Sequence, residues 1–232
     1  MTVKKEDSVG LAKESQYDSV IRNFGRRGPV RLGMHTSHFW REDPKRLGFM
    51  LARYKFVAKM LSGCGDVLEI GCGDGFGAEV VLQEVGRVHC VDFDPIFIEH
   101  CKKERSDKRL TFGVADLAKK PVSPPREAAY ALDVLEHIPK KDERQFLKNI
   151  VRSLKDSGIC IIGMPSLQSQ RYASSWSKKG HVNCKSGTDL KALLQKYFEH
   201  VFLFGMNDEV IHTGFLPMAH YLIAVCCRTK RG

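Results

Sequence analysis

The chain has 232 residues, a formal net charge of +10 at pH 7, and 43% hydrophobic and 28% charged positions. This length is enough for one large domain. The longest apolar runs, such as residues 221–227, end at strand length, so we expect no transmembrane helix and no membrane insertion. The first residues lead into no apolar segment, which argues against a cleaved secretory signal. We therefore expect a cytoplasmic protein.

Cysteine spacing and charge restrict the compartment, the metal content and the partners that we expect. The eight cysteines form no Cys-x-x-Cys pair and no Cys/His spacing typical of zinc, so a reducing compartment fits and we expect no metal. The 37 Lys and Arg residues outnumber the 27 Asp and Glu residues and are spread through the chain. Such a diffuse excess favours anionic partners without naming one. Nucleic acid is left open as a less favoured partner, and the oligomeric state is not indicated.

The predicted elements begin with an irregular segment and a helix. Residues 1–42 lack a clean periodicity and combine glycines with histidine and aromatic side chains, which we interpret as an N-terminal extension or lid. A helix is predicted to begin at Asp43 and Pro44, because Asp suits the N-cap and Pro the first helical position. Apolar residues between 47 and 61 continue it at helical spacing.

From residue 67 onward, short β-rich runs alternate with helical patterns, which is typical of a parallel sheet covered by helices. The predicted helices cover residues 76–85, a segment from 95, 142–154 and 187–198, the last with a Ser-x-x-Asp cap at 186–189. The predicted strands cover residues 67–70, 88–91, 110–114, 128–132, 159–164, 201–206 and 219–227. We predict an α/β fold with a doubly wound, seven-stranded sheet that is mostly parallel and ends in an antiparallel hairpin strand. Residues 43–232 are expected to form this single domain.

The most informative segment is VLEIGCGDGFG at residues 67–77. An apolar strand that runs into alternating glycines lets the backbone approach a ligand closely at the carboxyl end of a sheet. A tight turn alone does not explain Glu69, two residues before the first glycine. A dinucleotide fingerprint would need a glycine where Phe76 stands, and a GxxxxGK[ST] loop is missing. The segment predicts a nucleotide-type cofactor site.

The same segment resembles the first motif, ExGxGxG, of the class I S-adenosylmethionine-dependent methyltransferases. The resemblance covers about residues 63–228 and rests on several motifs in the correct order. It implies a Rossmann-like fold with S-adenosylmethionine as the cofactor, bound near Glu69, Gly71, Cys72 and Gly73. A nicotinamide-dependent dehydrogenase is the alternative cofactor assignment, and Phe76 weakens it.

Acidic residues after the next two strands extend the resemblance. Asp92 closes the second strand, where the family places an acid on the ribose hydroxyls, and a carboxylate can accept both hydroxyl hydrogen bonds. Phe93 would pack on the adenine, whereas Asp94 would cap the following helix. Asp116 matches the acid near the adenine amino group, and the Leu117 amide would complement it.

Three residues are candidates for a general base. Residues 132–138, LDVLEHI, resemble the fourth motif of the family, which places Asp133 near both the cofactor and the methyl group. His137 follows, with a packing role as its alternative. His181 lies in a Gly-His-Val-Asn run that resembles a loop after strand five in small-molecule and sugar methyltransferases, with an ordinary loop histidine as its alternative. Methyl transfer from a sulfonium is an in-line displacement that depends on alignment and, for a hydroxyl acceptor, on a base.

Candidate acceptor contacts are His35, Trp40, Arg53 and His181. The resemblance implies an enzyme that methylates an oxygen, or less favourably a nitrogen, of a small and anionic acceptor such as a sugar, nucleotide sugar or surface-polysaccharide precursor. Residues 1–42 would then form a lid over that acceptor. The alternatives are an RNA or protein methyltransferase and a non-catalytic protein that binds S-adenosylmethionine.

Overall fold

The computed structural model describes residues 12–230, and the chain divides into two compact units, Met1–Leu32 and Gly33–Gly232. The described part of the first unit holds a short 3-10 helix, η1 (Ser15–Tyr17), and helix α1 (Asp18–Arg27). Helix α2 (Met34–Glu42) belongs to the second unit, so the compact unit begins ten residues before the predicted boundary at residue 43. Residues 1–11 of the predicted extension lie outside the described residues. Within residues 12–230, no helix has the length and apolar character needed to cross a membrane.

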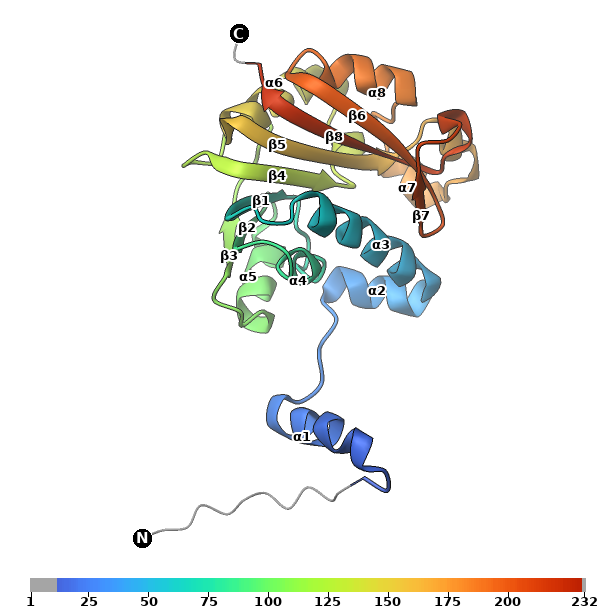
Figure 1. Cartoon of the computed structure of the whole chain (residues 1–232). Coiled ribbons are helices and arrows are strands. Elements are labelled where there is room, and N and C mark those ends of the chain that lie inside the picture. The colour runs from blue at the N-terminus through green and yellow to red at the C-terminus, as the bar shows by residue number, and fades with distance from the viewer. Residues whose placement is uncertain (1–11, 231–232) are drawn as a thin grey trace. The chain divides into compact units, whose positions relative to one another are not determined.

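The second unit is built on an eight-stranded sheet of order β3-β2-β1-β4-β5-β8-β6-β7 (Figure 1). Strands β1 to β5 run parallel, whereas β8 lies antiparallel between β5 and β6. The predicted α/β architecture and the antiparallel C-terminal pair are confirmed. The strands are β1 (Asp66–Ile70), β2 (Arg87–Asp92), β3 (Leu110–Val114), β4 (Arg126–Leu132), β5 (Leu154–Pro165), β6 (Phe198–Asn207), β7 (Val210–His212) and β8 (Tyr221–Thr229).

The prediction of seven strands is wrong, because the sheet has eight. The additional strand, β7, pairs antiparallel with the end of β6 through residues 205–207 and 210–212. Asp208, with φ of +50°, turns the chain between them. A three-residue strand is too short to show the alternation that identifies longer strands.

Helices cover both faces of the sheet (Figure 1). Helices α6 and α8 pack on one face, and α3, α4 and α5 pack on the other. Helix α4 is shorter than the predicted 76–85, because the glycine-rich loop continues to Gly77 and turns begin at residue 82. The helices are α3 (Lys45–Met60), α4 (Ala78–Val81), α5 (Pro95–Glu104), α6 (Lys140–Arg152), α7 (Ser175–Gly180) and α8 (Gly187–Leu194), and three 3-10 helices are η2 (Leu135–His137), η3 (Gln168–Tyr172) and η4 (Leu216–Met218).

Alternate residues of the central strands enter opposite layers of the core, as the two-residue period of a strand requires. In β1, Leu68 and Ile70 pack toward α6, whereas Val67 packs toward α3 and α4. Glu69 is two residues from Val67 and therefore faces the α3 side, where Tyr54 donates a hydrogen bond to it. The core thus fixes which side chain of β1 lies under which helix.

Two predicted helix caps are present. The Asp94 carboxylate accepts the Ile96 amide at 2.9 Å, with Pro95 at the first helical position of α5. The Ser186 hydroxyl accepts the Asp189 amide at 3.1 Å at the start of α8. These side chains satisfy amides that a helix leaves without partners at its N-terminus.

Candidate active site

The carboxyl ends of the parallel strands bring the predicted site residues to one edge of the sheet. In the register, Ile70 pairs with Val91, so the loop after β1 and the end of β2 are neighbours. Asp92 pairs with Val114 at the end of β3. At the end of β4, the Asp133 amide donates to the carbonyl of Gly163 on β5 at 3.0 Å. Crevices outside the carboxyl ends of such strands are where open α/β sheets bind ligands.

Three glycines of the loop after β1 have left-handed backbone conformations. The φ angles of Gly71, Gly73 and Gly75 are +74°, +52° and +67°. The amides of Gly71 and Cys72 donate to the Val91 carbonyl at 2.8 and 3.1 Å, which holds the loop against β2. A Cβ on Gly71 would lie 2.4 Å from Cγ2 of Val134, so the loop after β4 also requires glycine there.

Asp92 anchors this loop. One carboxylate oxygen accepts the Gly73 amide at 3.0 Å, and the other accepts the Asp94 amide at 3.0 Å. The residue is 7% exposed. A carboxylate has about four lone-pair directions, so two remain for ligand hydroxyl groups. Phe93 beside it is 73% exposed, which leaves its ring free of protein packing at the same edge.

Asp74, inside the glycine loop, has a role that the sequence prediction missed. Its carboxylate accepts the Thr36 amide at 2.7 Å and the Thr36 hydroxyl at 3.1 Å. It therefore caps the N-terminus of α2, where Gly33 offers no side chain of its own. A Cβ on Gly33 would lie 2.2 Å from Cβ of Asp74. Helix α2 is thus attached directly to the candidate cofactor loop.

Glu69 lies beneath the loop rather than at its surface. Its carboxyl oxygen Oε1 accepts the Tyr54 hydroxyl at 2.9 Å, and the residue is 2% exposed. Burial raises the pKa of Glu69 to about 7, and the hydrogen bond from Tyr54 partly opposes that shift. Its assignment as a direct cofactor contact stays a prediction.

The raised pKa of Glu69 predicts a pH-dependent stability. Because the folded state holds this proton between pH 4.5 and about 7 while the unfolded state releases it, stability is full below pH 4.5 and falls as pH rises through this window. We expect the free energy of unfolding in urea to fall by about 2–3 kcal/mol more between pH 5 and pH 8 in the native chain than in Glu69→Gln. Exposed Glu99→Gln is the control and should keep the native pH dependence. An equal pH dependence in Glu69→Gln would contradict this assignment.

Asp116 and Leu117 follow β3 at the same edge. The Ala115 amide donates to the Asp92 carbonyl at 2.9 Å, which fixes the start of this segment. The Asp116 carboxylate accepts the Ala118 amide at 3.0 Å and forms an ion pair with Lys119 at 3.0 Å. Leu117 is buried, at 3% exposure. Their roles at an adenine stay predictions.

Asp133 and Arg53, predicted for different roles, form an ion pair. A guanidinium nitrogen of Arg53 donates to both carboxylate oxygens, at 3.1 and 2.8 Å. The guanidinium also lies over the Tyr221 ring, 3.8 Å from its centre. The backbone of Asp133 has a φ of +56°, a rare conformation outside glycine. The Arg53 side chain therefore engages both carboxylate oxygens of Asp133.

His137 and His181 come together from segments far apart in the sequence. Their ring centres are 5.3 Å apart. The Nδ1 atom of His137 bonds to the Gly180 carbonyl at 2.9 Å, and that of His181 bonds to the Gln170 side-chain oxygen at 2.8 Å. Burial lowers the pKa of His181, and His137 lowers it further. Glu136, which the prediction omitted although it precedes His137, is fully buried beside them.

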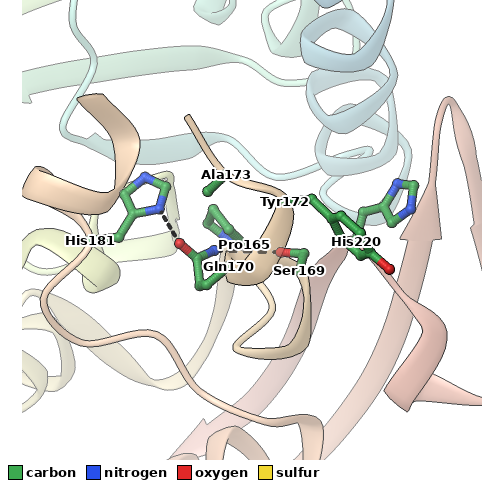
Figure 2. Close-up of a pocket in the computed structure, with 7 residues that line it drawn as sticks. All are labelled: Pro165, Ser169, Gln170, Tyr172, Ala173, His181 and His220. Atoms are coloured by element: carbon green, nitrogen blue, oxygen red, sulfur yellow. Dashed lines mark hydrogen bonds between the residues drawn. The ribbon is translucent and has the colours of Figure 1, made fainter. Parts of the chain in front are cut away.

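His181 also forms part of a pocket at the end of β5. Figure 2 shows the imidazole and the Gln170 side chain joined by a hydrogen bond at this pocket, which has a volume of about 540 Å³. Tyr172 is 75% exposed at its margin. The pocket is lined by Pro165, Ser169, Gln170, Tyr172, Ala173, His181 and His220.

The remaining predicted acceptor contacts lie on α2. The His35 ring packs 4.3 Å from the Phe39 ring, and its Nδ1 would be 3.7 Å from a Cβ on Gly73. Trp40 is 50% exposed and does not line the pocket at β5. The structure therefore brings His35 to the cofactor loop and leaves the role of Trp40 a prediction.

Comparisons with known sequences find similar proteins among methyltransferases. Residues 67–158 match the sequence model of a family described as a methyltransferase domain. A Mycobacterium tuberculosis protein named a probable S-adenosylmethionine-dependent methyltransferase is 29% identical over 102 residues, which are 44% of this chain and 36% of that protein. The ubiquinone biosynthesis O-methyltransferase of Xylella fastidiosa is 25% identical over 172 residues, or 64% of this chain and 69% of that enzyme. The chain thus spans about a third of the length of the mycobacterial relative.

Solved structures show the same fold. The N-methyltransferase NodS of Bradyrhizobium japonicum, in complex with S-adenosylhomocysteine, has a TM-score of 0.59 and 17% identity over 93% of this chain and 99% of that chain. A putative methyltransferase of Haloferax volcanii, in complex with the Trm112 methyltransferase activator, has a TM-score of 0.63 and 16% identity over 82% and 96% of the two chains.

Proposed function

Because this chain carries a class I S-adenosylmethionine-dependent methyltransferase domain, we propose that it is an enzyme that transfers a methyl group from S-adenosylmethionine to a hydroxyl oxygen of a small molecule. The observation that carries this proposal is the edge of the sheet where Asp92 fixes the glycine loop and where Asp133 follows β4, with His181 in the pocket at the end of β5. The named O-methyltransferase relative favours oxygen as the acceptor atom. NodS, named as an N-methyltransferase, keeps nitrogen as the second candidate.

The cofactor edge fits a ligand that combines a ribose with a purine. Asp92 has two lone-pair directions left for hydroxyl groups after accepting from Gly73 and Asp94. At Gly73, the nearest atom to a Cβ would be 3.7 Å away, so the missing side chain leaves room for close approach to the backbone. Phe93 offers an unpacked aromatic face next to Asp92. When bound, S-adenosylmethionine would supply an electrophilic methyl group on a sulfonium.

The residues of the acceptor side then position the reacting oxygen. In the proposed transfer, the hydroxyl oxygen would form a bond to the methyl carbon, the C–S bond would break with its electron pair remaining on sulfur, and the hydroxyl proton would be released. The bond to Gln170 occupies Nδ1 of His181 and leaves its Nε2 lone pair for an acceptor hydroxyl. Arg53 occupies both carboxylate oxygens of Asp133, so we assign Asp133 a positioning role rather than that of the general base. Alignment of the two reactants supplies most of the rate enhancement.

The pocket at the end of β5 restricts the size and the charge of the acceptor. Its volume of about 540 Å³ suits a small molecule. Its lining carries tyrosine and imidazole groups but no lysine or arginine, so we propose that a neutral, hydroxyl-bearing part of the acceptor enters it. The net charge of +10 would act on any anionic portion outside the pocket. A sugar or a phenol meets these conditions, whereas RNA or a protein side chain would be the alternative outcome.

Calorimetric titration with S-adenosylmethionine and S-adenosylhomocysteine, followed by a transfer assay with a labelled methyl group, tests this function. We expect micromolar binding of both ligands, no binding of NAD, and transfer to sugars, nucleotide sugars or phenols rather than to RNA. Binding without transfer to any of these acceptors would favour a non-catalytic binding protein. Binding of NAD alone would overturn the proposal.

We retain the lid as part of the proposal, with its boundary moved to the compact unit that ends at Leu32. Tyr17, Val20 and Phe24 form an apolar stripe at helical spacing along η1 and α1, and each is more than half exposed, at 53%, 60% and 62%. An exposed stripe of this kind suits a segment that closes on another surface.

Removal of residues 1–32 is expected to abolish acceptor methylation and leave S-adenosylhomocysteine affinity within about threefold, because Asp74 keeps its contact with Thr36. Removal of residues 1–42 deletes that contact as well and should weaken cofactor binding. Calorimetry and turnover of both truncated chains would measure this, and full turnover without residues 1–32 would exclude a lid.

A further inference from the structure

Glu136, His137 and His181 form a compact cluster between the acceptor pocket and the end of β4. One possible ligand atom from each of these side chains lies within 4.8 Å of the others. Glu136 and His137 come from η2, directly after β4, whereas His181 follows α7. The amides of Val182 and Asn183 donate to the Glu136 carbonyl at 2.9 and 3.0 Å, so the backbone fixes the two segments against each other. The cluster is therefore built into the fold and is not a chance approach of mobile side chains.

The Glu136 side chain has no hydrogen-bond partner from another residue within the described part of the chain. The residue is 0% exposed, and both carboxyl oxygens are buried and unpartnered. Burying a polar group without a partner is unfavourable, and burying a charged one is more so. Its neighbours in the cluster are the two imidazoles. A buried and unpartnered acid beside two imidazoles points to a ligand that is not part of the chain.

The hydrogen bonds of the two histidines fix which nitrogen is free. A backbone carbonyl can only accept, so the bond from His137 to Gly180 places the proton on Nδ1 of His137. The amide nitrogen of Gln170 donates to the Ser166 carbonyl at 3.2 Å, which orients the amide oxygen toward His181. The bond from His181 therefore also places a proton on Nδ1, and both neutral rings keep a lone pair on Nε2.

We propose that Glu136, His137 and His181 bind a divalent first-row transition-metal ion through a carboxylate oxygen and the two Nε2 atoms. Two imidazoles and one carboxylate are a donor set for such ions that leaves other coordination positions open. A hydrogen bond from Nδ1 to a carbonyl oxygen is the usual support of a metal-binding histidine, and both rings have it. This replaces the expectation from sequence that the protein needs no metal.

The proposed ion would lie next to the acceptor pocket and would take part in methyl transfer. This role of the ion rests on the proposed function. His181 belongs both to the cluster and to the lining of the pocket. A bound divalent ion lowers the pKa of an oxygen ligand and would ease loss of the hydroxyl proton to water. The oxygen then forms its bond to the methyl carbon while the C–S electron pair leaves with sulfur. On this proposal the Nε2 atom of His181 binds the ion, and this role replaces the contact with an acceptor hydroxyl given above.

Manganese binding by the full chain tests the site without any assay of turnover. After treatment with a chelator, the chain is titrated with Mn²⁺ and the free ion is measured by electron paramagnetic resonance. We expect about one Mn²⁺ per chain, and affinities at least tenfold lower in Glu136→Gln and in His181→Ala. His200→Ala, an exposed histidine on β6 outside the cluster, is the matched control and should bind as the native chain does.

These experiments distinguish failure of the metal site from failure of the proposed function. Equal binding of Mn²⁺ by the native chain and both cluster variants, or no binding by any of them, overturns the site. Circular dichroism of Glu136→Gln and His181→Ala must show a folded chain, and His137→Ala provides a further ligand variant if either fails. Titration with S-adenosylhomocysteine is run separately, so loss of that binding with intact Mn²⁺ binding would refute the function and leave the metal site standing.

Discussion

Asp92→Asn is expected to weaken the binding of S-adenosylhomocysteine about 100-fold while the chain remains folded. The Asp92 carboxylate accepts the amides of Gly73 and Asp94 on different oxygens, and we propose that the remaining lone pairs of these oxygens accept the ribose hydroxyls. An asparagine loses the charge and presents amide hydrogens where one oxygen must accept. Loss of charge-assisted hydrogen bonds worth about 3 kcal/mol in total accounts for the expected change.

The matched control for this change is Asp94→Asn, two residues away. Asp94 accepts the Ile96 amide as the N-cap of α5, and asparagine caps helices as well as aspartate does. Its S-adenosylhomocysteine affinity should therefore equal that of the native chain in calorimetry. Equal losses in both variants would show that general disturbance of the β2–α5 junction, and not a ligand contact of Asp92, lowers the affinity.

Gly71→Ala is expected to lower the free energy of unfolding by about 3 kcal/mol, through two separate causes. The φ of +74° at Gly71 costs a residue with a Cβ about 1–2 kcal/mol. The new Cβ would also lie 2.4 Å from Cγ2 of Val134, and such overpacking costs about 1–3 kcal/mol. Urea unfolding measures the sum.

Two further variants separate these causes. Gly73→Ala has the backbone cost alone, because the nearest atom to its Cβ, in His35, is 3.7 Å away. The double variant with Gly71→Ala and Val134→Ala removes the overlap and should unfold at higher urea than the sum of the two single changes predicts. Additive losses in the double variant would contradict contact between the loops after β1 and β4.

Local patterns in the sequence determined most of the fold and of the cofactor edge. The strand that ends in alternating glycines, Asp92 at the end of the next strand, and the caps at Asp94 and Ser186 all involve residues close together in the chain. Strand alternation and helix capping depend on residues only a few positions apart, so both can be recognised from the sequence alone. The short β7 strand falls below the length at which such patterns are visible.

Only the tertiary structure decided the partners within the site. Thr36 contacts Asp74 across 38 residues, Arg53 pairs with Asp133 across 80, and His137 bonds to Gly180 across 43. No local preference encodes these contacts, because they form only when α2, α3 and α7 pack against the segments that follow β1 and β4. Single residues such as Glu136 and His181 carry little signal by themselves. Their proposed role is inferred from the unpartnered burial of Glu136 and from the position of both residues in one cluster. Both features arise only from tertiary packing.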